Sequence, residues 1–411
     1  MSVSPSPLID PAVALQRLLA AVHVLADVDV VPTAAALGRV LASDVVATID
    51  VPPADNTQMD GYALCSADVP VAGTSLAVSQ RIPAGSVPQP LQRGTAARIF
   101  TGGLMPAGAD CVVMQEDCSA EGDRVSVRVV PQPGDWVRRR GLDVAAGSAV
   151  LKAGQRLRPQ DLGLAAAVGV ATLTVRRRPR VAVLFTGDEL AMPGEPLPPG
   201  AIYNSNRFVI QALLQAAGCE VTDFGTVPDA IDATRAALRA AARGHDLIVS
   251  TGGMSVGEED HVKPAVQAEG MLDLWQIAMK PGKPLAFGSV RRGESAGEAA
   301  FIGLPGNPVS SFVTFLMFVR PFLLALQGMR ETAPIALPVR AAFDWPKPDR
   351  RREFLRVRLN AQGEAELFPN QNAAVLTSTT WADGLVDNPP QQPIRRGDTL
   401  RYLPFSALLQ G

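Results

Sequence analysis

The residues best suited to bind a ligand lie between positions 250 and 260, where the chain reads Ser-Thr-Gly-Gly-Met-Ser-Val-Gly-Glu-Glu-Asp. This segment begins at the end of an apolar run that predicts a strand, Leu247–Ser250. Glycines and small hydroxyl residues leave backbone N–H groups free to cradle an anion at close range. The three terminal carboxylates would repel a phosphate unless a cation lay between them, so the pattern predicts Mg²⁺ bridging to a phosphorylated ligand. The alternative is a Gly-rich strand-to-helix turn whose acids favour the helix N-terminus.

Two further loops are expected at the same edge of the same domain. The first, Thr186–Leu190, follows an apolar run and offers two more carboxylates. The second, Gly303–Ser311, follows the strand-like Ala300–Gly303 and opens a long apolar stretch. Pro308 suits a first helical turn with Asn307 as its cap, so a purely structural interpretation stands beside anion binding at the helix N-terminus.

Two lysines three residues apart, Lys280 and Lys283, lie on a turn with the sequence Met-Lys-Pro-Gly-Lys-Pro. Because the prolines fix the backbone, both ammonium groups would be presented with little conformational entropy to lose, which suits an anionic ligand. The alternative is a pair of solvated surface lysines.

Three more positions carry charges whose role the residues alone leave open. Asp60, followed by Gly61, is typical of a simple turn. The basic cluster Arg138–Arg140, closed by Asp143, could bind phosphate or form a solvated face. Asp229 could be the N-cap of a helix. Neither a P-loop nor a G-x-G-x-x-G motif opens the α/β part, so nucleotide binding of those types is not expected.

The composition excludes several classes of protein. Lys and Arg number 38 against 40 Asp and Glu, and the net charge of −2 argues against a dedicated nucleic-acid binder. The 4 Cys form no C-x-x-C pair and only 3 His are present, so we expect no structural zinc or disulfide framework, and a reducing cytosol. No export signal precedes the first helix, and the apolar run after Ser310 is cut by Arg320 and Pro321. We therefore expect a buried helix there and a cytoplasmic protein without a membrane span.

Hydrophobic periodicity indicates the elements that must position these groups. At 411 residues the chain should hold two to four domains. Helices are predicted over Leu8–Val28 and Thr33–Leu41, and a β-rich module runs from Val51 to about Arg140. Strands apolar on both faces then alternate with helices, which predicts a mostly parallel sheet covered on both sides, with ligands at the carboxyl ends of its strands. After Gly328 short strands return and predict a small C-terminal β domain.

These segments, in this order, resemble the molybdopterin molybdenumtransferase family, which comprises the bacterial MoeA proteins and the E domain of gephyrin. The matching stretches span most of the chain. They are Met59–Ala63, Thr101–Gly102, Arg139–Gly141 with Asp143, Thr186–Leu190, Tyr203–Asn206, Ser250–Asp260, Lys280–Pro284 and Gly303–Ser311.

The resemblance implies a multidomain α/β plus β subunit of four parts that dimerises. A discontinuous helical and β domain, 7–48 with 146–178, would carry an inserted β-rich domain, 49–145. A central three-layer α/β domain with a mostly parallel sheet, 179–328, would bind molybdopterin. A C-terminal β domain, 329–411, would complete the subunit.

The implied reaction transfers molybdenum from molybdate to adenylylated molybdopterin, giving molybdenum cofactor and AMP with the help of Mg²⁺. The active cleft would form between the α/β domain of one subunit and the β-rich domain of the other. The partners implied are the two substrates, a second copy of the chain, the upstream molybdopterin adenylyltransferase and molybdoenzyme chaperones. Neither nucleic acid nor membrane is among them.

The resemblance also gives roles to individual residues. Glu189 and Asp260 would hold Mg²⁺, with Asp229 lining the same site, while Lys280 and Lys283 would bind molybdate or phosphate oxygens. The other substrate-binding residues would be Ser250, Thr251, Gly252, Gly253, Ser255, Pro305 and Asn307. The β-rich domain of the partner subunit would contribute Asp60, Thr101 and Asp143, which replaces the interpretation of Asp60 as a simple turn.

One segment departs from the family pattern. Members commonly carry a Gly-Gln-Gly-Ser-like turn in the last domain, whereas this chain has Pro-Asn-Gln-Asn-Ala at Pro369–Ala373 and lacks the hydroxyl. The strand after it, which is Val-Leu-Pro-like in the family, has Val-Asp-Asn-Pro at Val386–Pro389. The substrate contacts of the C-terminal domain are therefore open. A paralogue that handles tungstate, a related pyrophosphatase or amidase, and a non-catalytic molybdopterin-binding or scaffold protein remain as alternatives.

Overall fold

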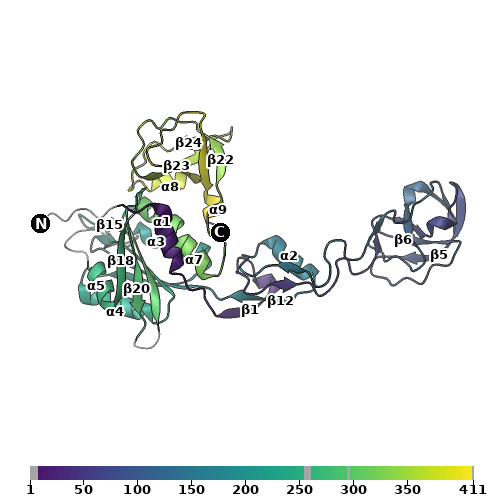
Figure 1. Cartoon of the computed structure of the whole chain (residues 1–411), viewed down its shortest axis with the longest axis horizontal. Coiled ribbons are helices and arrows are strands. Elements are labelled where there is room, and N and C mark those ends of the chain that lie inside the picture. Colours follow the sequence, from purple (N-terminus) through teal and green to yellow (C-terminus); the bar gives the residue numbers. More distant parts are fainter. Residues whose placement is uncertain (1–7, 254–260, 294–296, 410–411) are drawn as a thin grey trace. The chain divides into compact units, whose positions relative to one another are not determined.

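The computed structural model describes residues 8–253, 261–293 and 297–409 (Figure 1). The chain forms two compact units. The first comprises Met1–Asp29, Gly38–Val40 and Arg176–Gly411, and the second comprises Val30–Leu37 and Leu41–Val175. Each unit is thus assembled from segments that lie far apart in sequence.

A six-stranded sheet forms the centre of the first unit. Its strand order is β16 (Glu220–Val227), β13 (Arg180–Thr186), β17 (Leu247–Thr251), β21 (Glu298–Leu304), β20 (Pro284–Arg291) and β18 (Gly270–Gln276). The first four strands are parallel, whereas β20 runs antiparallel to both of its neighbours. The prediction of a mostly parallel sheet is confirmed, and the carboxyl ends of all strands except β20 lie at one edge.

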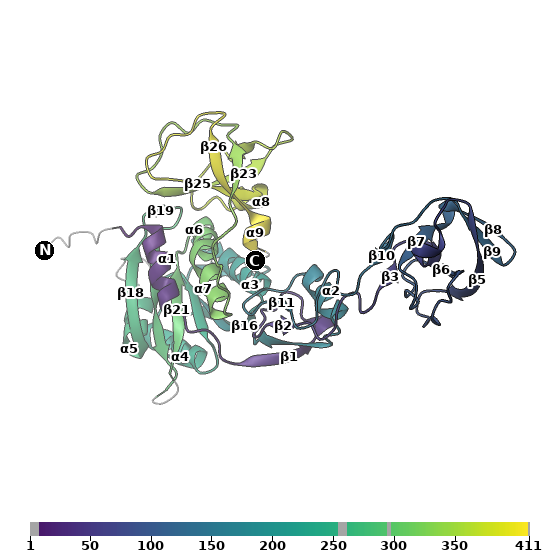
Figure 2. The same cartoon turned by 45° about the vertical axis from the view of Figure 1, so that its right-hand side comes forward.

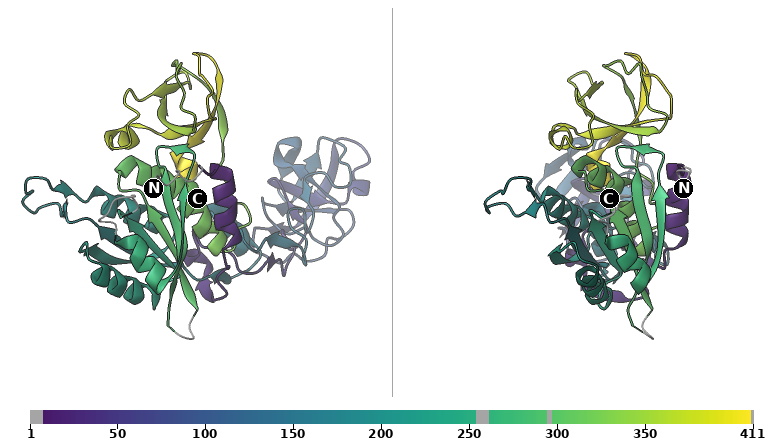
Figure 3. Two further views of the ribbon diagram at one scale, coloured as in Figure 1. Left: turned by 60° about the vertical axis from the view of Figure 1, so that its left-hand side comes forward. Right: turned by 90° about the vertical axis from the view of Figure 1, so that its left-hand side faces the viewer.

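Helices cover both faces of this sheet, because its strands are apolar on both sides (Figures 2 and 3). In β13, Val183 packs in the core on one face, and the adjacent Leu184 packs in the core on the other. The first core includes α1 (Pro11–Ala20), α3 (Ser205–Ala216) and a long apolar helix, and the second includes α4 (Ile231–Ala242) and α5 (Val262–Glu269).

The long apolar helix consists of α6 (Pro308–Thr314), a π-helical segment η4 (Phe315–Val319) and α7 (Arg320–Leu326). Arg320 and Pro321 do not cut this run, contrary to the prediction. The π-helical segment ends at Val319, two residues before Pro321, whose missing N–H and ring are incompatible with a regular α-helical turn. Among the described residues this is the one helix long and apolar enough to cross a membrane, and 89% of its apolar window is buried inside the protein. The prediction of a buried helix is therefore confirmed.

Two helix predictions near the N-terminus were wrong. The first helix ends at Ala20 instead of Val28, and Val28–Pro32 forms strand β1, which pairs with β12 (Thr172–Arg176). The run Val-Asp-Val-Val favours a strand because β-branched side chains pack well on a pleated surface. Only Thr33–Ala35 of the second prediction is helical, as a single 3₁₀ turn.

The C-terminal residues form a second sheet in the first unit. Its order is β19 (Met279–Lys280), β23 (Arg352–Leu359), β25 (Gly384–Asn388), β26 (Thr399–Pro404) and β22 (Leu337–Arg340), with β24 (Ala365–Leu367) paired to β23. Strand β19 is the Lys-Pro turn segment that precedes β20 of the first sheet, so it joins the two sheets. Phe405, from the C-terminal segment, packs in the same core as Phe312 of α6, with 5.3 Å between the ring centroids.

The second unit contains the β-rich module. Its sheet has the order β7 (Cys111–Met114), β4 (Gly61–Leu64), β6 (Thr95–Ile99), β5 (Thr74–Ile82), β9 (Arg124–Val127) and β8 (Cys118–Glu121). A separate core in this unit joins residues from both ends of the segment, such as Val45 and Leu151, beneath α2 (Pro159–Ala167). There β2 (Val45–Val46) pairs with β11 (Ala149–Leu151), so the module lies between two chain segments that fold together.

Candidate functional site

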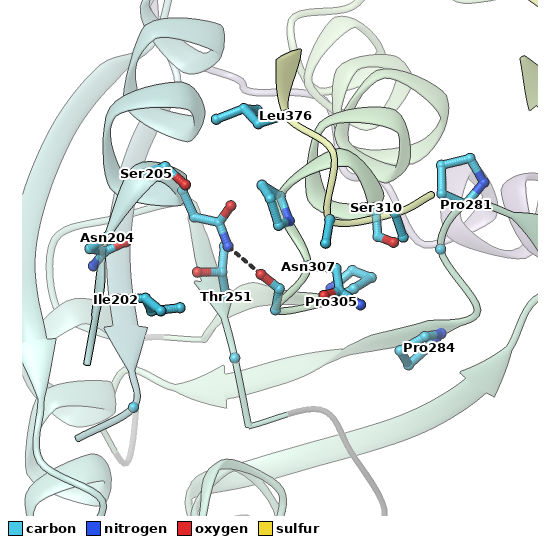
Figure 4. Close-up of a pocket in the computed structure, with 18 of the residues that line it drawn as sticks. Ile202, Asn204, Ser205, Thr251, Pro281, Pro284, Pro305, Asn307, Ser310 and Leu376 are labelled. Carbon is cyan, nitrogen blue, oxygen red and sulfur yellow. Dashed lines mark hydrogen bonds between the residues drawn. The ribbon is translucent and has the colours of Figure 1, made fainter. Parts of the chain in front are cut away.

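A cavity of about 1170 Å³ lies at the carboxyl edge of the first sheet (Figure 4). Its walls come from the loops after β13, β16, β17 and β21, from the turn between β18 and β20, and from the C-terminal domain. Pockets for drug-sized ligands occupy roughly 300–1,000 Å³, so this one has room for a large ligand. The candidate residues that line it are Glu189, Asp229, Thr251, Gly252, Gly253, Lys280, Lys283, Pro305 and Asn307.

The other candidate residues do not line this cavity or are not described. Ser250 is fully buried at the end of β17. Asp60, Thr101 and Asp143 belong to the second unit. Ser255 and Asp260 lie outside the described residues.

The turn after β17 requires glycine at Gly252. Its φ is +89°, and a Cβ at this position would collide with the carbonyl oxygen of Thr186 at the end of β13. Glycine therefore allows the ends of the two central strands to approach each other closely. The same absence of a side chain leaves backbone at the cavity wall, where a ligand can reach it.

Several polar groups at this edge have no hydrogen-bond partner within the described part of the chain. They include Thr186 Oγ1, Asn204 Nδ2 and Asn206 Oδ1 in the cavity lining, and Ser250 Oγ beneath it. Buried polar atoms are nearly always paired, and leaving one unpaired costs about 1–3 kcal/mol. Unpaired groups gathered around one cavity indicate a place where a polar ligand supplies the missing partners.

The two asparagines also join neighbouring loops. Asn204 Oδ1 accepts the N–H of Arg207 and so caps α3, at 3.1 Å. Asn206 Nδ2 donates to the carbonyl oxygen of Gly306, at 2.7 Å (Figure 4). Asn307 begins α6 with Pro308 in the first turn, as the sequence predicts, but its side chain makes no capping hydrogen bond. Its carboxamide is therefore available at the cavity wall.

Acidic side chains gather at the ends of β13 and β16. The N–H of Asp229 donates to Asp188 Oδ1 at 3.3 Å, and Glu189 follows Asp188 in the chain. Partial burial raises the pKa of Asp229, and the negative charges of Asp188 and Glu189 raise it further. Helix α4 is capped by Ala230, so the interpretation of Asp229 as its N-cap is wrong. Among the described residues, no group of three or more His, Cys, Asp or Glu side chains is arranged to hold a metal ion.

The two lysines of the Lys-Pro turn have different surroundings. Lys280 Nζ lies 3.4 Å from Glu353 Oε1 and 3.5 Å from Asp349 Oδ2, both in the C-terminal domain. Lys283 forms no ion pair with any described residue. Arg351 also lines the cavity, with its guanidinium held by Asp349 at 2.9 Å. The cavity therefore has three cationic side chains within reach of a bound anion.

The altered turn of the C-terminal domain does reach the cavity. Gln371, Asn372 and Ala373 line it, and the carbonyl oxygen of Ala373 accepts the N–H of Val309 in α6 at 3.1 Å. The turn thus contributes a carboxamide and backbone but no hydroxyl at Ala373.

Arg356 supports this turn from behind. It is 1% exposed, and it donates to Ser378 Oγ, to the Phe354 carbonyl and to the Asn372 carbonyl, at 3.2, 3.1 and 3.4 Å. None of the described carboxylates forms an ion pair with it. Burial alone lowers the pKa of Arg356 to about 10. A buried cation with neutral partners is costly, which makes the region beside the turn favourable for an anion.

Asp60 and Thr101 contact each other in the second unit. Asp60 Oδ1 accepts both the N–H and the hydroxyl of Thr101, each at 2.7 Å. These hydrogen bonds, and to a smaller extent the positive charge of Arg98, lower the pKa of Asp60. Asp60 is therefore a fixed, ionised acceptor and is more than the tip of a turn.

Asp143 lies at the base of the same module. Its N–H donates to the carbonyl oxygen of Val51 at 2.9 Å, and its side chain is exposed. The adjacent arginines are engaged locally: Arg139 pairs with Asp55 at 2.7 Å and Arg140 pairs with Asp50. Among the described contacts, Asp143 is not hydrogen-bonded to Asp60 or Thr101.

Several cavity residues were not among the candidates from sequence. They are Thr186, Asn204, Asn206, Arg351, Gln371 and Asn372. The first three belong to segments already singled out, and a hydroxyl or carboxamide next to a strand end was the available signal. Gln371 and Asn372 lie in the C-terminal turn that the family resemblance singled out, whereas Arg351 comes from a domain distant in sequence and no local pattern connects it with the α/β domain.

Comparison with sequence families accounts for most of the chain. Residues 9–169 match the MoeA N-terminal region (domain I and II). Residues 182–325 match a probable molybdopterin binding domain, and residues 338–405 match the MoeA C-terminal region (domain IV).

Curated relatives give the same result. A protein of Haemophilus influenzae named molybdopterin molybdenumtransferase is 38% identical over 384 residues, which covers 91% of this chain and 93% of the relative. One from Nostoc sp. with the same name is 38% identical over 336 residues, covering 80% and 76%. Molybdopterin molybdenumtransferase 2 of Mycobacterium tuberculosis is 38% identical over 371 residues, covering 87% and 90%.

Solved structures agree with the fold. A molybdopterin biosynthesis MoeA protein of Pyrococcus horikoshii superposes with a TM-score of 0.84 at 29% identity, covering 97% of this chain and all of the other. A second structure described as the MoeA protein of that organism gives a TM-score of 0.80 at 30% identity, covering 97% and 99%. The multidomain α/β plus β fold is thereby confirmed. With three matched regions, relatives nearly two-fifths identical and a fold shared over the whole length, the chain belongs to the molybdopterin molybdenumtransferase family, that of the MoeA proteins.

Proposed function

We propose that this chain is a molybdopterin molybdenumtransferase whose cavity binds adenylylated molybdopterin and molybdate and releases molybdenum cofactor and AMP. The observation that carries the proposal is the gathering, at one sheet edge, of carboxylates, lysines and a glycine turn surrounded by unpaired polar groups. The names of the curated relatives support the same reaction.

In this reaction water attacks the phosphoanhydride between the pterin phosphate and AMP, its oxygen bonds to one phosphorus, and AMP leaves as negative charge grows on the departing phosphate. The turn Thr251–Gly253 presents backbone to the cavity for the phosphate end of the pterin. Thr186 Oγ1 and Asn206 Oδ1, buried and unpaired, are placed to take up polar groups of the substrate. Because these groups are fixed by the strand ends, they need little reorganisation when the charge develops.

Molybdate is a doubly charged oxyanion and needs cationic partners. Lys280 and Lys283 supply two positive charges on one turn, and Arg351 supplies a third from the C-terminal domain. In the proposed reaction the two dithiolene thiols of the pterin form bonds to molybdenum, and the molybdate oxygen that they displace takes up their two protons and leaves as water. The lysines hold the oxyanion close to these sulfurs and favour this step by proximity.

The acidic side of the cavity is where the family resemblance would place a magnesium ion. Burial, and then the negative charges of Asp188 and Glu189, raise the pKa of Asp229, and carboxylate oxygens are the kind of ligand that Mg²⁺ prefers. Glu189 and Asp260 would hold the ion, with Asp229 lining the same site. When bound, Mg²⁺ neutralises charge on the phosphate oxygens.

A homodimer is part of the proposal. In it, Asp60, Thr101 and Asp143 of one subunit act on substrate bound in the cavity of the other, as the family resemblance implies. The Asp60–Thr101 pair supports this, because Asp60 is ionised and held in one orientation although neither residue belongs to a described hydrophobic core of the unit. Light scattering tests the dimer directly, and a monomeric mass would remove the composite cleft.

The choice of oxyanion belongs to the proposal as well. Molybdate is the substrate favoured by the family, while Ala373 at the cavity wall favours testing tungstate as an alternative, because a hydroxyl is missing there. We further propose a cytoplasmic enzyme that receives its substrate from a molybdopterin adenylyltransferase and passes its product to molybdoenzyme chaperones. A non-catalytic scaffold would not require the unpaired polar groups and the cations of the cavity.

The deciding experiment measures AMP released by the purified protein from adenylylated molybdopterin and Mg²⁺, with molybdate, with tungstate and with neither. We expect release that depends on molybdate. Release that is independent of any oxyanion would favour a pyrophosphatase instead, and no release with any oxyanion would favour a binding or scaffold protein.

A further inference from the structure

We propose that Glu353, a buried carboxylate of the C-terminal domain, is a positioning residue that holds Lys280 in place for binding the oxyanion. The inference rests on the proposed function, because it concerns how that site acquires its cation. It goes beyond that function by assigning a role to a residue that does not itself line the cavity.

The backbone brings the two residues together. Strand β19 pairs with β23 in parallel, and the register places Lys280 beside Glu353 and Met279 beside Arg352. The N–H of Arg352 also donates to the carbonyl oxygen of Ala278 at 2.9 Å. Adjacent residues in such a pair project to the same side of the sheet, so the ammonium and the carboxylate meet although 73 positions separate them in the chain.

Side chains other than Lys280 hold the carboxylate of Glu353 in place. Its side chain is 1% exposed. Trp345 Nε1 donates to Oε2 at 2.8 Å, and Asn388 Nδ2 approaches the same oxygen at 3.5 Å. Both are neutral donors, and within the described residues Lys280 is the one cation at ion-pairing distance. A buried carboxylate that retains its charge needs such a counter-charge, so the Lys280 ammonium is drawn to one place.

The geometry leaves Lys280 available for a ligand. Its contacts with Glu353 and Asp349, 3.4 and 3.5 Å, are longer than the 2.7–2.9 Å of a tight charged hydrogen bond. Its side chain is still 39% exposed and lines the cavity. An ammonium has three N–H donors, so two weakly engaged carboxylates leave one donor for an oxyanion.

Lys283 provides the contrast within the same turn. It lines the cavity but has no ion-pair partner among the described residues, and its side chain must lose rotamer freedom when an anion binds. Lys280, which lies beside two carboxylates, has less of that freedom left to lose. Preorganisation of this kind favours affinity, because part of the ordering cost is met during folding.

The test replaces Glu353 by its uncharged isostere. In the full-length Glu353→Gln protein we expect the dissociation constant for molybdate, measured by titration calorimetry, to rise about tenfold, because Lys280 is released from its position. The KM for adenylylated molybdopterin should change less than about twofold, since that ligand is bound mainly by the strand-end loops.

Asp387 offers a matched control. It is 7% exposed, lies on the adjacent strand β25 and pairs with Arg352 and Arg401, but it does not line the cavity. Asp387→Asn removes a buried charge from the same sheet. It should lower the unfolding temperature and leave the molybdate affinity unchanged. Equal losses of molybdate affinity in the two variants would overturn the proposal in favour of general damage to the domain.

A double-mutant cycle separates this inference from the proposed function. If Lys280→Met alone leaves molybdate binding unchanged, the lysine assignment of the proposed function fails. If Lys280→Met weakens binding and Glu353→Gln does not, only the positioning role fails. We expect Glu353→Gln to add no further loss in the Lys280→Met background, because both changes remove one interaction.

A second variant that retains the charge keeps the proposal testable if the glutamine variant does not fold. Glu353→Asp withdraws the carboxylate by one methylene group and should likewise weaken molybdate binding. Wild-type affinity in a folded Glu353→Asp protein would overturn the positioning role.

Discussion

Asp60 in the β-rich module and Asp229 at the sheet edge are both partly accessible aspartates, but their surroundings act on them in opposite directions. Asp60 accepts two hydrogen bonds from Thr101, and these lower its pKa. Asp229 is partly buried beside two other acids, and this raises its pKa. The first site is satisfied in the free protein, whereas in the second the negative charges of Asp188 and Glu189 act against the ionised form of Asp229. In the proposed reaction, the module would therefore contribute an acceptor that is already ionised and oriented, and the acidic side of the cavity would change its charge state only when ligands bind.

We expect the largest effect at Asp229, the aspartate at the edge of the sheet. Asp229→Asn should reduce the rate of AMP release by about a hundred- to a thousandfold, because charge neutralisation at the leaving phosphate is lost. The same change should slightly raise the unfolding temperature, since repulsion among the acids is relieved. Asp232→Asn, at an exposed position of α4 three residues further along, is the control and should do neither. A wild-type rate in Asp229→Asn would remove this residue from the site.

The second prediction concerns Asp60 and tests its role together with the proposed dimer. Asp60→Ala and Lys280→Met should each be strongly impaired. An equimolar mixture, after subunit exchange, should recover about a quarter of the wild-type activity, because half of the dimers are mixed and one of their two composite sites is intact. Mixing wild-type protein with either variant controls for exchange. No recovery despite proven exchange would place both residues in the site of a single subunit.

The two aspartates should also respond oppositely to pH. Asp60, with a lowered folded pKa, stabilises the protein above the pKa of the unfolded chain, near 3.8, and this contribution is lost as the pH falls through the folded value. Asp229 has a raised pKa in the folded protein, so it stabilises the fold when its carboxyl is protonated, which is fully the case below the pKa of the unfolded chain. This contribution is lost as the pH rises through the folded pKa of Asp229.

Chemical denaturation as a function of pH measures both contributions. At pH 7, Asp60→Asn should be less stable than wild type and Asp229→Asn more stable, and both differences should shrink at acid pH. Mg²⁺ should stabilise the wild-type protein at pH 7 and have little effect on Asp229→Asn. Differences of the same sign for the two variants would contradict the comparison.

The smallest effect concerns one unpaired hydroxyl at the cavity. Thr186→Val retains the shape of the side chain but removes Oγ1, which is buried without a partner in the described structure. We expect the free protein to gain about 1–3 °C in unfolding temperature and the KM for adenylylated molybdopterin to rise about threefold to tenfold. Thr234→Val is the control, because the Thr234 hydroxyl is paired, donating to the carbonyl oxygen of Ala230 at 3.0 Å, and Thr234 does not line the cavity. A loss of stability in Thr186→Val would show that its hydroxyl is already paired.

The sequence predicted the central sheet and its functional edge because both depend on local pattern. Continuous apolar runs such as Val181–Phe185 identify buried parallel strands, and the glycine turns directly after them mark the carboxyl ends. Leu8–Val28 failed because an apolar spacing compatible with a helix continued into a β-branched segment that pairs with a distant strand. Propensity could not decide where one pattern yields to the other.

The part of the site that could not be predicted depends on contacts between distant segments. Arg351 and Gln371 reach the cavity only because the C-terminal sheet incorporates β19, a pairing of two residues. The opposite pKa directions of Asp60 and Asp229 likewise depend on neighbours 41 positions away in each case. Such neighbours are set by the tertiary fold, and the local sequence around each aspartate contains no pattern that predicts them.

The short pairing between β19 and β23 has a consequence for synthesis of the protein. The ribosome completes the sheet of the α/β domain before Glu353 and the rest of the last domain have emerged. Domains generally fold as units in order of synthesis, so a nascent chain at this stage can hold the loops at the carboxyl edge of the sheet in place while the ion pair of Lys280 with Glu353 is still missing. Under the positioning role proposed for Glu353, the preorganisation of Lys280 is thus acquired last.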